Sequence, residues 1–137
     1  MKTSELIGAA LDWAVAKCEG RTILQFIGGG ILVNGRTEIG DELLQEQGFN
    51  YMWHPSTNWT QGGPIIEREK IWLRGPNDAC KPDGTVVVHI DYWYAHINHK
   101  HVQNDAAPLI AAMRCYVASK LGDGVEISEW LVGEQDV

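Results

Sequence analysis

Two segments with helical periodicity, near opposite ends of the chain, constrain the fold more than any other feature. In the first, over about residues 3–19, apolar side chains recur at helical spacing and form one stripe: Ile7, Ala10, Leu11, Ala14, Val15 and Cys18. The carboxylates are expected away from that stripe: Glu5, Asp12 and Glu19. Thr3 or Ser4 can cap the start of the helix, and Gly20 can end it in a left-handed conformation.

The second helix is predicted from about Asp105 or Ala106 to Leu121. Asp105 can accept a hydrogen bond from a free backbone N–H at its start, and Pro108 is tolerated in the first turn. Gly122 follows its end.

Strand patterns lie between the two helices. Residues 23–27 and 31–33 are β-type runs joined by the triple glycine at 28–30, which suggests a hairpin. Residues 85–97 alternate as one long strand after the turn signal Pro82-Asp83-Gly84. Ile65–Leu73 is compatible with helix or strand, and we favour a strand because Pro64 precedes it and Gly75-Pro76 ends it.

The remaining segment, residues 35–63, is rich in Gly, Asn, Gln and Thr, which predicts loop with a short helical turn at about 41–46. These elements together predict an α+β fold. Two main helices pack on a small, mainly antiparallel sheet, with a long loop containing Gly and Trp. With 137 residues, no repeat and no linker, the chain is expected to form a single domain over 1–137.

Bulk composition narrows the functional classes. The net charge of -7 argues against nonspecific nucleic-acid binding, which needs a basic surface. The three cysteines lack disulfide or metal-site spacing, so they are expected to be reduced. No signal peptide or membrane-spanning run is recognisable, which predicts a cytoplasmic protein without membrane association. Most of the six tryptophans are expected in the core.

Arg114 is the most informative single residue. It falls within or at the border of the apolar stripe of the second helix, where a guanidinium is partly desolvated and needs a partner. That partner is either a carboxylate such as Glu67 or Glu69, which makes a structural ion pair, or an anion brought by a ligand.

The segment Trp53–Pro64 gathers aromatic, amide and hydroxyl side chains with two adjacent glycines. Such a mixture can build a small polar pocket, since aromatic faces stack on planar rings and glycine N–H groups approach oxyanions closely. Alternatively, the aromatic residues anchor a long loop and the glycines only turn it. With the two arginines, the candidate ligand-binding residues are Trp53, Asn58, Trp59, Gln61, Gly62, Gly63, Arg68 and Arg114.

Histidines suggest a second kind of chemistry. His89, Asp91, His96 and His99 could act as acid, base or metal ligand, but no metal-binding signature is present and we favour a solvated, irregular His/Asn/Lys loop. No metal site and no cofactor are therefore assigned.

Three stretches carry a resemblance to a known family. Lys2–Leu6 with Ala10–Ala16, then Pro55–Glu69, then Pro108–Asp123 resemble, in order, the NinX family of lambda-like phages and prophages. Asn58 stands where an Asp is expected, and Trp53 where a Tyr is expected. The resemblance implies an accessory protein of the phage-infected bacterial cytoplasm, without implying a reaction.

The residues and the resemblance together suggest a non-catalytic binder, which would be homo-oligomeric and would sequester a small anionic nucleotide-type signal of host antiviral defence. In this hypothesis Trp53 and Trp59 stack a base, while Arg68 and Arg114 hold phosphates. The main alternative is a phosphodiesterase that cleaves such a signal with the histidines above. A third is a protein-binding regulator of DNA metabolism, anchored by exposed aromatic residues.

Overall fold

The computed structural model describes residues 1–37 and 50–127. A short 3₁₀ turn, Thr3–Glu5, precedes the first helix. The helices are α1 (Gly8–Cys18), α3 (Trp59–Glu69) and α4 (Pro108–Leu121). The strands are β1 (Arg21–Ile27), β2 (Gly30–Thr37), β3 (Tyr51–Trp53), β4 (Trp72–Arg74), β5 (Asn77–Cys80), β6 (Val86–Ile90), β7 (Trp93–Ile97) and β8 (Lys100–Asp105).

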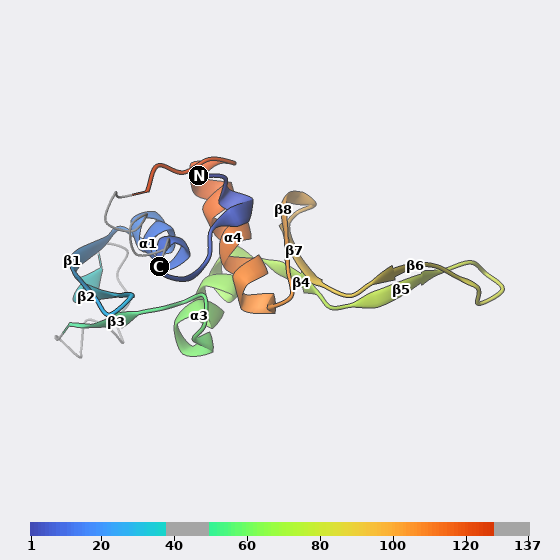
Figure 1. Ribbon diagram of the computed structural model, residues 1–137, viewed down its shortest axis with the longest axis horizontal. Coiled ribbons are helices and arrows are strands. Elements are labelled where there is room, and N and C mark those ends of the chain that lie inside the picture. Colours follow the sequence, from blue (N-terminus) through green and yellow to red (C-terminus); the bar gives the residue numbers. More distant parts are fainter. Residues whose placement is uncertain (38–49, 128–137) are drawn as a thin grey trace.

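The helices separate two antiparallel sheets, which confirms the α+β class. Strands β1-β2-β3 form one sheet and β4-β7-β8 the other, while β5 and β6 form a two-stranded ribbon. Helices α1 and α4 pack together between the two sheets, α1 beside the first and α4 beside the second (Figure 1). The prediction of one small sheet was wrong in this respect, because each of the two helices has its own sheet.

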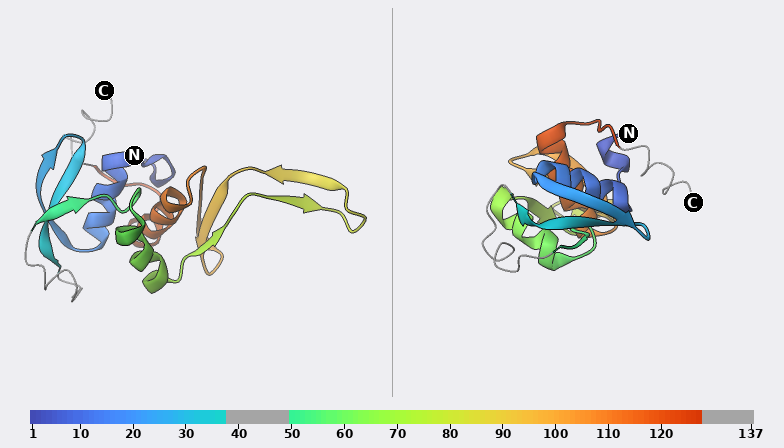
Figure 2. Two further views of the ribbon diagram at one scale, coloured as in Figure 1. Left: turned by 90° about the horizontal axis from the view of Figure 1, so that it is seen from below. Right: turned by 90° about the vertical axis from the view of Figure 1, so that its left-hand side faces the viewer.

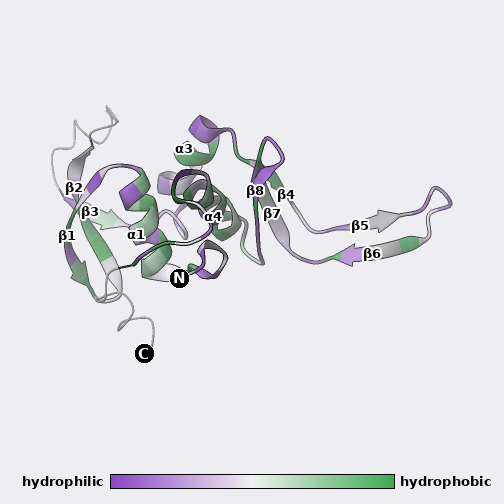
Figure 3. Ribbon diagram, turned by 90° about the horizontal axis from the view of Figure 1, so that it is seen from above, coloured by the Kyte–Doolittle hydropathy of each residue, from purple (hydrophilic) through white to green (hydrophobic). Residues whose placement is uncertain are grey.

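The core lies along the contact between α1 and α4. Every residue of α4 from Ala111 to Ala118 is buried, since this helix has α1 on one side and the second sheet on the other. A helix enclosed in this way is hydrophobic on nearly all sides. Figure 3 shows hydrophobic colouring on the facing parts of α1 and α4.

The first helix is confirmed, with corrections at its start and on its polar face. It begins at Gly8, and Thr3 does not cap it but donates from its hydroxyl to the carbonyl of Gly122 at 2.6 Å. Gly20 follows the helix with a φ of 68°, as predicted. Asp12 and Glu19 are buried rather than turned to solvent. Both carboxylates are held by groups from other elements, which periodicity within one helix cannot reveal.

The strand predicted over Ile65–Leu73 was mostly wrong. Helix α3 runs to Glu69, and only Trp72–Arg74 is strand. Asn58 begins the helix, because its side-chain oxygen accepts a hydrogen bond from the Thr60 N–H at 2.8 Å. The helix continues through Gly62, Gly63 and Pro64, so the loop predicted over 35–63 also contains β3 and the first turn of this helix. The helical turn predicted at 41–46 lies outside the described residues.

The long strand predicted over 85–97 is divided by a bend at Asp91 and Tyr92. The part before the bend, β6, pairs with β5 and extends away from the body of the molecule, whereas β7 is the central strand of the second sheet (Figure 2). The turn signal at residues 82–84 is confirmed at the tip of the ribbon, where Gly84 has a φ of 90°. The hairpin of β1 and β2 around the triple glycine is also confirmed.

Candidate functional site

Arg114 is buried and fully engaged by its own chain. Its Nε donates to the carbonyl of Leu6 at 2.7 Å, and its Nη1 donates to the carbonyl of Asn104 at 3.0 Å and to Oδ1 of Asp105 at 3.1 Å. The predicted carboxylate partner is present, but it is Asp105 and not Glu67 or Glu69. Asp105 precedes α4, and its other oxygen accepts a hydrogen bond from the Ala107 N–H at 2.9 Å. Because Ala107 lies before the first helical residue, this bond does not cap the helix, and the prediction that Asp105 caps it was wrong.

Arg68 takes part in a second ion pair, beside the end of α1. Its guanidinium donates to both carboxylate oxygens of Glu19, at 3.1 and 2.6 Å, and Tyr116 donates to Glu19 at 2.6 Å. Burial tends to lower the pKa of Arg68, but Glu19 outweighs it and the pKa is raised. Burial and the same carboxylate raise the pKa of Tyr116 well above its ordinary value. This cluster ties α1, α3 and α4 together.

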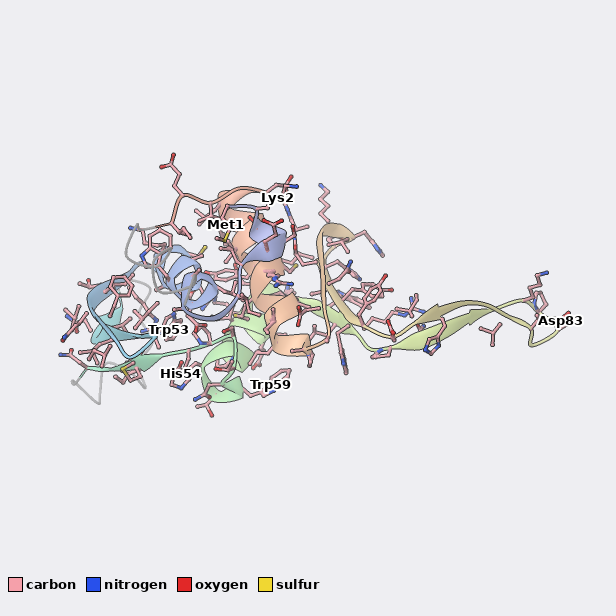
Figure 4. All side chains as sticks on the ribbon, in the orientation of Figure 1. Met1, Lys2, Trp53, His54, Trp59 and Asp83 are labelled. Atoms are coloured by element: carbon pink, nitrogen blue, oxygen red, sulfur yellow. The ribbon has the colours of Figure 1, made fainter. Side chains whose placement is uncertain are left out.

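Several polar residues of the predicted pocket fasten the chain before and within α3. Trp53 is buried and donates from its indole N–H to the carbonyl of Asp12 at 3.1 Å. Gln61 donates to the carbonyl of Met52 at 2.8 Å and accepts from the His54 N–H at 2.7 Å. Trp53 and His54 are labelled in Figure 4, between α1 and α3. These contacts fit the alternative in which the segment is anchored to the core.

The two glycines of this segment differ in their surroundings. A β-carbon on Gly62 would lie 2.5 Å from the carbonyl oxygen of Pro55 and 2.7 Å from Cδ1 of Leu109, so close packing explains this glycine. Gly63 has open space around it. Trp59, labelled in Figure 4, is 53% exposed at the start of α3. Of the predicted ligand-binding residues, Trp59 and Gly63 are thus the ones without an evident packing role.

Asp12 is the buried carboxylate nearest to this segment. Its Oδ1 accepts a hydrogen bond from the Ser56 N–H at 2.9 Å. Burial raises the pKa of Asp12 to about 6, although that hydrogen bond and the charge of His54 act in the opposite direction. Asp12 and His54 border a shallow hollow of about 440 Å³ beside the Gly28–Gly30 turn.

The residues proposed for phosphodiesterase chemistry are divided between two places. His89 lies on the ribbon and Asp91 at the bend, both exposed, whereas His96 and His99 line a hollow on the second sheet. Within residues 1–37 and 50–127, no group of three His, Cys, Asp or Glu side chains is arranged to hold a metal ion.

That hollow lies on the face of the second sheet opposite α4, and two cross-strand rows build it. Trp72 of β4 pairs with His96 of β7, and Arg74 of β4 pairs with Tyr94 of β7. Residues between them, Leu73 and Ala95, point to the helix side, because side chains alternate along a strand. We call this set, with the added members His99 and Val102, the aromatic platform: Trp72, Arg74, Tyr94, His96, His99 and Val102.

Rings stack along the platform. The Trp72 and His96 rings are 5.7 Å apart and inclined by 16°, and the His96 and His99 rings are 5.0 Å apart and inclined by 13°. Arg74 donates from Nη1 to the Tyr94 hydroxyl at 3.0 Å. Trp72 nevertheless remains 67% exposed. A large indole face and a guanidinium are therefore open to a ligand on the same surface.

The turn between β7 and β8 determines which nitrogen of His96 carries a proton. Asn98 and His99 both have positive φ angles, 51° and 64°, as a tight two-residue hairpin turn requires. In this turn the His99 backbone N–H donates to Nδ1 of His96 at 3.1 Å. Since Nδ1 accepts, the proton of the neutral ring is on Nε2. His96 thus has an Nε2–H donor available for an acceptor atom on a ligand.

The platform can hold a planar ring with an attached anion. Its hollow measures about 520 Å³, within the range of small-molecule sites. The indole supplies a stacking face, and Arg74 and the imidazoles supply donors for negatively charged oxygens. Unlike Arg114, Arg74 is exposed.

Sequence reasoning missed Trp72, Arg74, Tyr94 and Val102 as site residues. A signal was present, because Trp72 and Arg74 are two residues apart, as are Tyr94 and His96, so each pair falls on one face of a strand. The predicted strand over Ile65–Leu73 combined the end of α3 with the start of β4, so this alternation was not recognised.

The structure tests two further expectations, the burial of the tryptophans and the state of the cysteines. Among the tryptophans in the described residues only Trp53 is buried, Trp13 and Trp93 are half-buried, and Trp59 and Trp72 are exposed, so the expectation of mostly core tryptophans was wrong. Cys18 and Cys115 are free. Burial raises the pKa of each thiol to about 12, which is consistent with packing rather than nucleophilic roles.

Comparison with known protein families identifies the family of this chain. The family described as Bacteriophage P22, NinX matches residues 2–120. The chain belongs to the NinX family. This confirms the resemblance seen in its three motifs and makes the chain a phage accessory protein. No curated protein matches this chain. Within its described residues, no helix is long and apolar enough to cross a membrane.

Proposed function

We propose that this NinX-family protein binds a small anionic nucleotide-type ligand on the aromatic platform and sequesters it without cleaving it. The observation that carries the proposal is the exposed Trp72 indole stacked on His96, beside the guanidinium of Arg74. Stacking accepts any planar base, and the guanidinium supplies the charge-assisted hydrogen bonds that phosphate oxygens favour. The setting is the cytoplasm of the phage-infected host, where the ligand would be a signal of antiviral defence.

Each platform residue has a distinct role in this proposal. The base stacks on Trp72, the phosphate lies at Arg74, and the Nε2–H of His96 donates to a ligand oxygen or ring nitrogen. This moves the proposed site away from Arg68 and Arg114, whose donors already bind Glu19 and Asp105. An anion there would have to displace an internal carboxylate, which is costly.

The test compares two exposed tryptophans. Binding of cyclic dinucleotides, cyclic ADP-ribose isomers and ordinary nucleotides is measured by titration calorimetry, with Trp72→Ala, Arg74→Ala and Trp59→Ala proteins. We expect the wild type to bind at least one of them. Trp72→Ala should weaken binding on the order of 10-fold to 100-fold, as for loss of one stacked base. Trp59→Ala should leave it unchanged.

The other outcomes distinguish the alternatives. If Trp59→Ala abolishes binding and Trp72→Ala does not, the site belongs to α3. Conversion of the ligand at substoichiometric protein, lost on changing His96 or His99, indicates a phosphodiesterase. Failure of the folded wild type to bind any member of the panel refutes the proposal and leaves a protein-binding regulator as the hypothesis to pursue.

A further inference from the structure

The strands β5 and β6 pair with each other and have few contacts with the other described elements. The strands of this ribbon pair from Asn77 opposite Ile90 to Cys80 opposite Val86, and no third strand extends them within the described residues. Figures 1 and 2 show the ribbon extending away from the helices and the sheets, with Asp83 at its tip in Figure 4. A two-stranded ribbon is marginally stable in water unless something packs on it.

The composition of the ribbon is that of a covered strand. Residues 86–90 read Val-Val-Val-His-Ile, a β-branched run that is typical of strands packed against a neighbour. Val86 is 53% exposed, and Tyr92, at the base of the ribbon, is 39% exposed. Both outer edges of the ribbon also present backbone groups that no strand of the described chain pairs with.

The charge of the ribbon indicates which surface packs on it. Residues 77–91 contain three Asp and one Lys, so the ribbon is acidic. The second sheet carries the opposite charge on two exposed residues, Arg74 and Lys100. The ribbon leads away from this sheet, so the two surfaces of one copy do not meet (Figure 2). Between two copies they can.

We infer that the ribbon is an arm that packs on the second sheet of another copy of this chain. The apolar side chain of Val86 then has partners in exposed Val102 and Trp72. The exposed Asp83 and Asp91 can lie near Lys100. An exchange of arms about a two-fold axis uses both contacts twice. The inference does not rest on the proposed ligand, but both use Trp72 and Val102, so a packed arm and a bound ligand would compete for the platform.

The test is the mass of the full-length protein in solution. Sedimentation equilibrium is recorded from about 1 to 100 μM protein, a range suited to micromolar dissociation constants. The variants are Val86→Asp, on the arm, and Leu24→Asp, on β1, where the exposed leucine is matched in accessibility at 45%. We expect the wild type and Leu24→Asp to self-associate alike, and Val86→Asp to raise the dissociation constant about 100-fold, because a charge would be buried.

A Lys100→Glu variant tests the charge contact separately. It places a carboxylate near the acidic arm, so it should also weaken association, and addition of salt should reduce the difference from the wild type. Circular dichroism verifies that each variant is folded. A wild type that remains monomeric throughout the range refutes the inference, as does an oligomer that Val86→Asp leaves intact.

Discussion

The interior charges and the aromatic platform show opposite uses of similar side chains. Inside, Arg114 is 7% exposed, and its guanidinium is surrounded by two carbonyls and the Asp105 carboxylate. On the platform, Arg74 is exposed and donates to the Tyr94 hydroxyl, beside an indole that is 67% exposed. An arginine within an apolar stripe therefore indicates internal pairing, whereas exposed rings beside an exposed cation leave capacity for a ligand.

The largest expected effect is the difference in unfolding free energy between Arg114→Met and Arg74→Met. Arg114→Met leaves Asp105 and two carbonyls without their donor, so we expect the free energy of unfolding to fall by about 3–5 kcal/mol. Arg74→Met removes an exposed contact and should cost less than about 1 kcal/mol. Urea unfolding followed by circular dichroism measures both, and equal losses would contradict the comparison.

The buried carboxyl group of Asp12 should make the free energy of unfolding depend on pH. Its folded pKa of about 6 is above the ordinary 3.8, so between these values the folded chain holds a proton that the unfolded chain has released. Its contribution to stability is thus present below pH 4 and is lost as the pH rises to 6, by up to about 3 kcal/mol.

The matched variant is Asp12→Asn, which keeps an oxygen acceptor for the Ser56 N–H. We expect it to lose less stability than the wild type between pH 4 and 6, measured as the difference in unfolding free energy at each pH. Parallel curves would show that the Asp12 carboxylate titrates normally.

The adjacent glycines of α3 give a smaller effect with an internal control. Gly62→Ala forces a methyl group against Pro55 and Leu109 and should destabilise the protein by about 1–3 kcal/mol. Gly63→Ala meets open space within the same helix, so it should be neutral or stabilise by about 0.5–1 kcal/mol. Thermal unfolding of the pair isolates packing from helix propensity.

The smallest effect is expected at Trp72. Because its indole is mostly exposed, Trp72→Ala should change the free energy of unfolding by no more than about 0.5 kcal/mol. A larger loss in urea unfolding would mean that the platform, like the contacts of Arg114, stabilises the fold.

Helix α1 and two of the turns could be predicted because the sequence patterns that specify them lie within single segments. The stripe of α1 and the glycine at position 20 belong to single segments, as do the turns at residues 28–29 and 82–84. Helix α3 could not be read in the same way. Its Gly62, Gly63 and Pro64 resemble a break, and what favours the helix is the Asn58 cap together with packing of Ile65 in the core.

The site was predictable in its residue chemistry but not in its position. Arg114 was expected to pair with either a carboxylate or a ligand anion, and Asp105 became its partner because β8 leads directly into α4. His96 was singled out for its imidazole, while its neighbour Trp72 lies on a strand that is distant in sequence. Cross-strand register brings them together, and no local pattern specifies register.

Continuity of the strands links the arm to the platform mechanically. Strand β4 leads into β5 through Gly75, and β6 leads into β7 through the bend at Asp91 and Tyr92. A β-carbon on Gly75 would lie 3.2 Å from the Trp93 ring, so that indole lies directly on the junction. Anything that fixes the arm therefore restricts the strands that carry Trp72 and His96. Because an arm packed on the platform and a ligand stacked on Trp72 would use the same surface, each must weaken the binding of the other to the same degree, since such coupling is reciprocal.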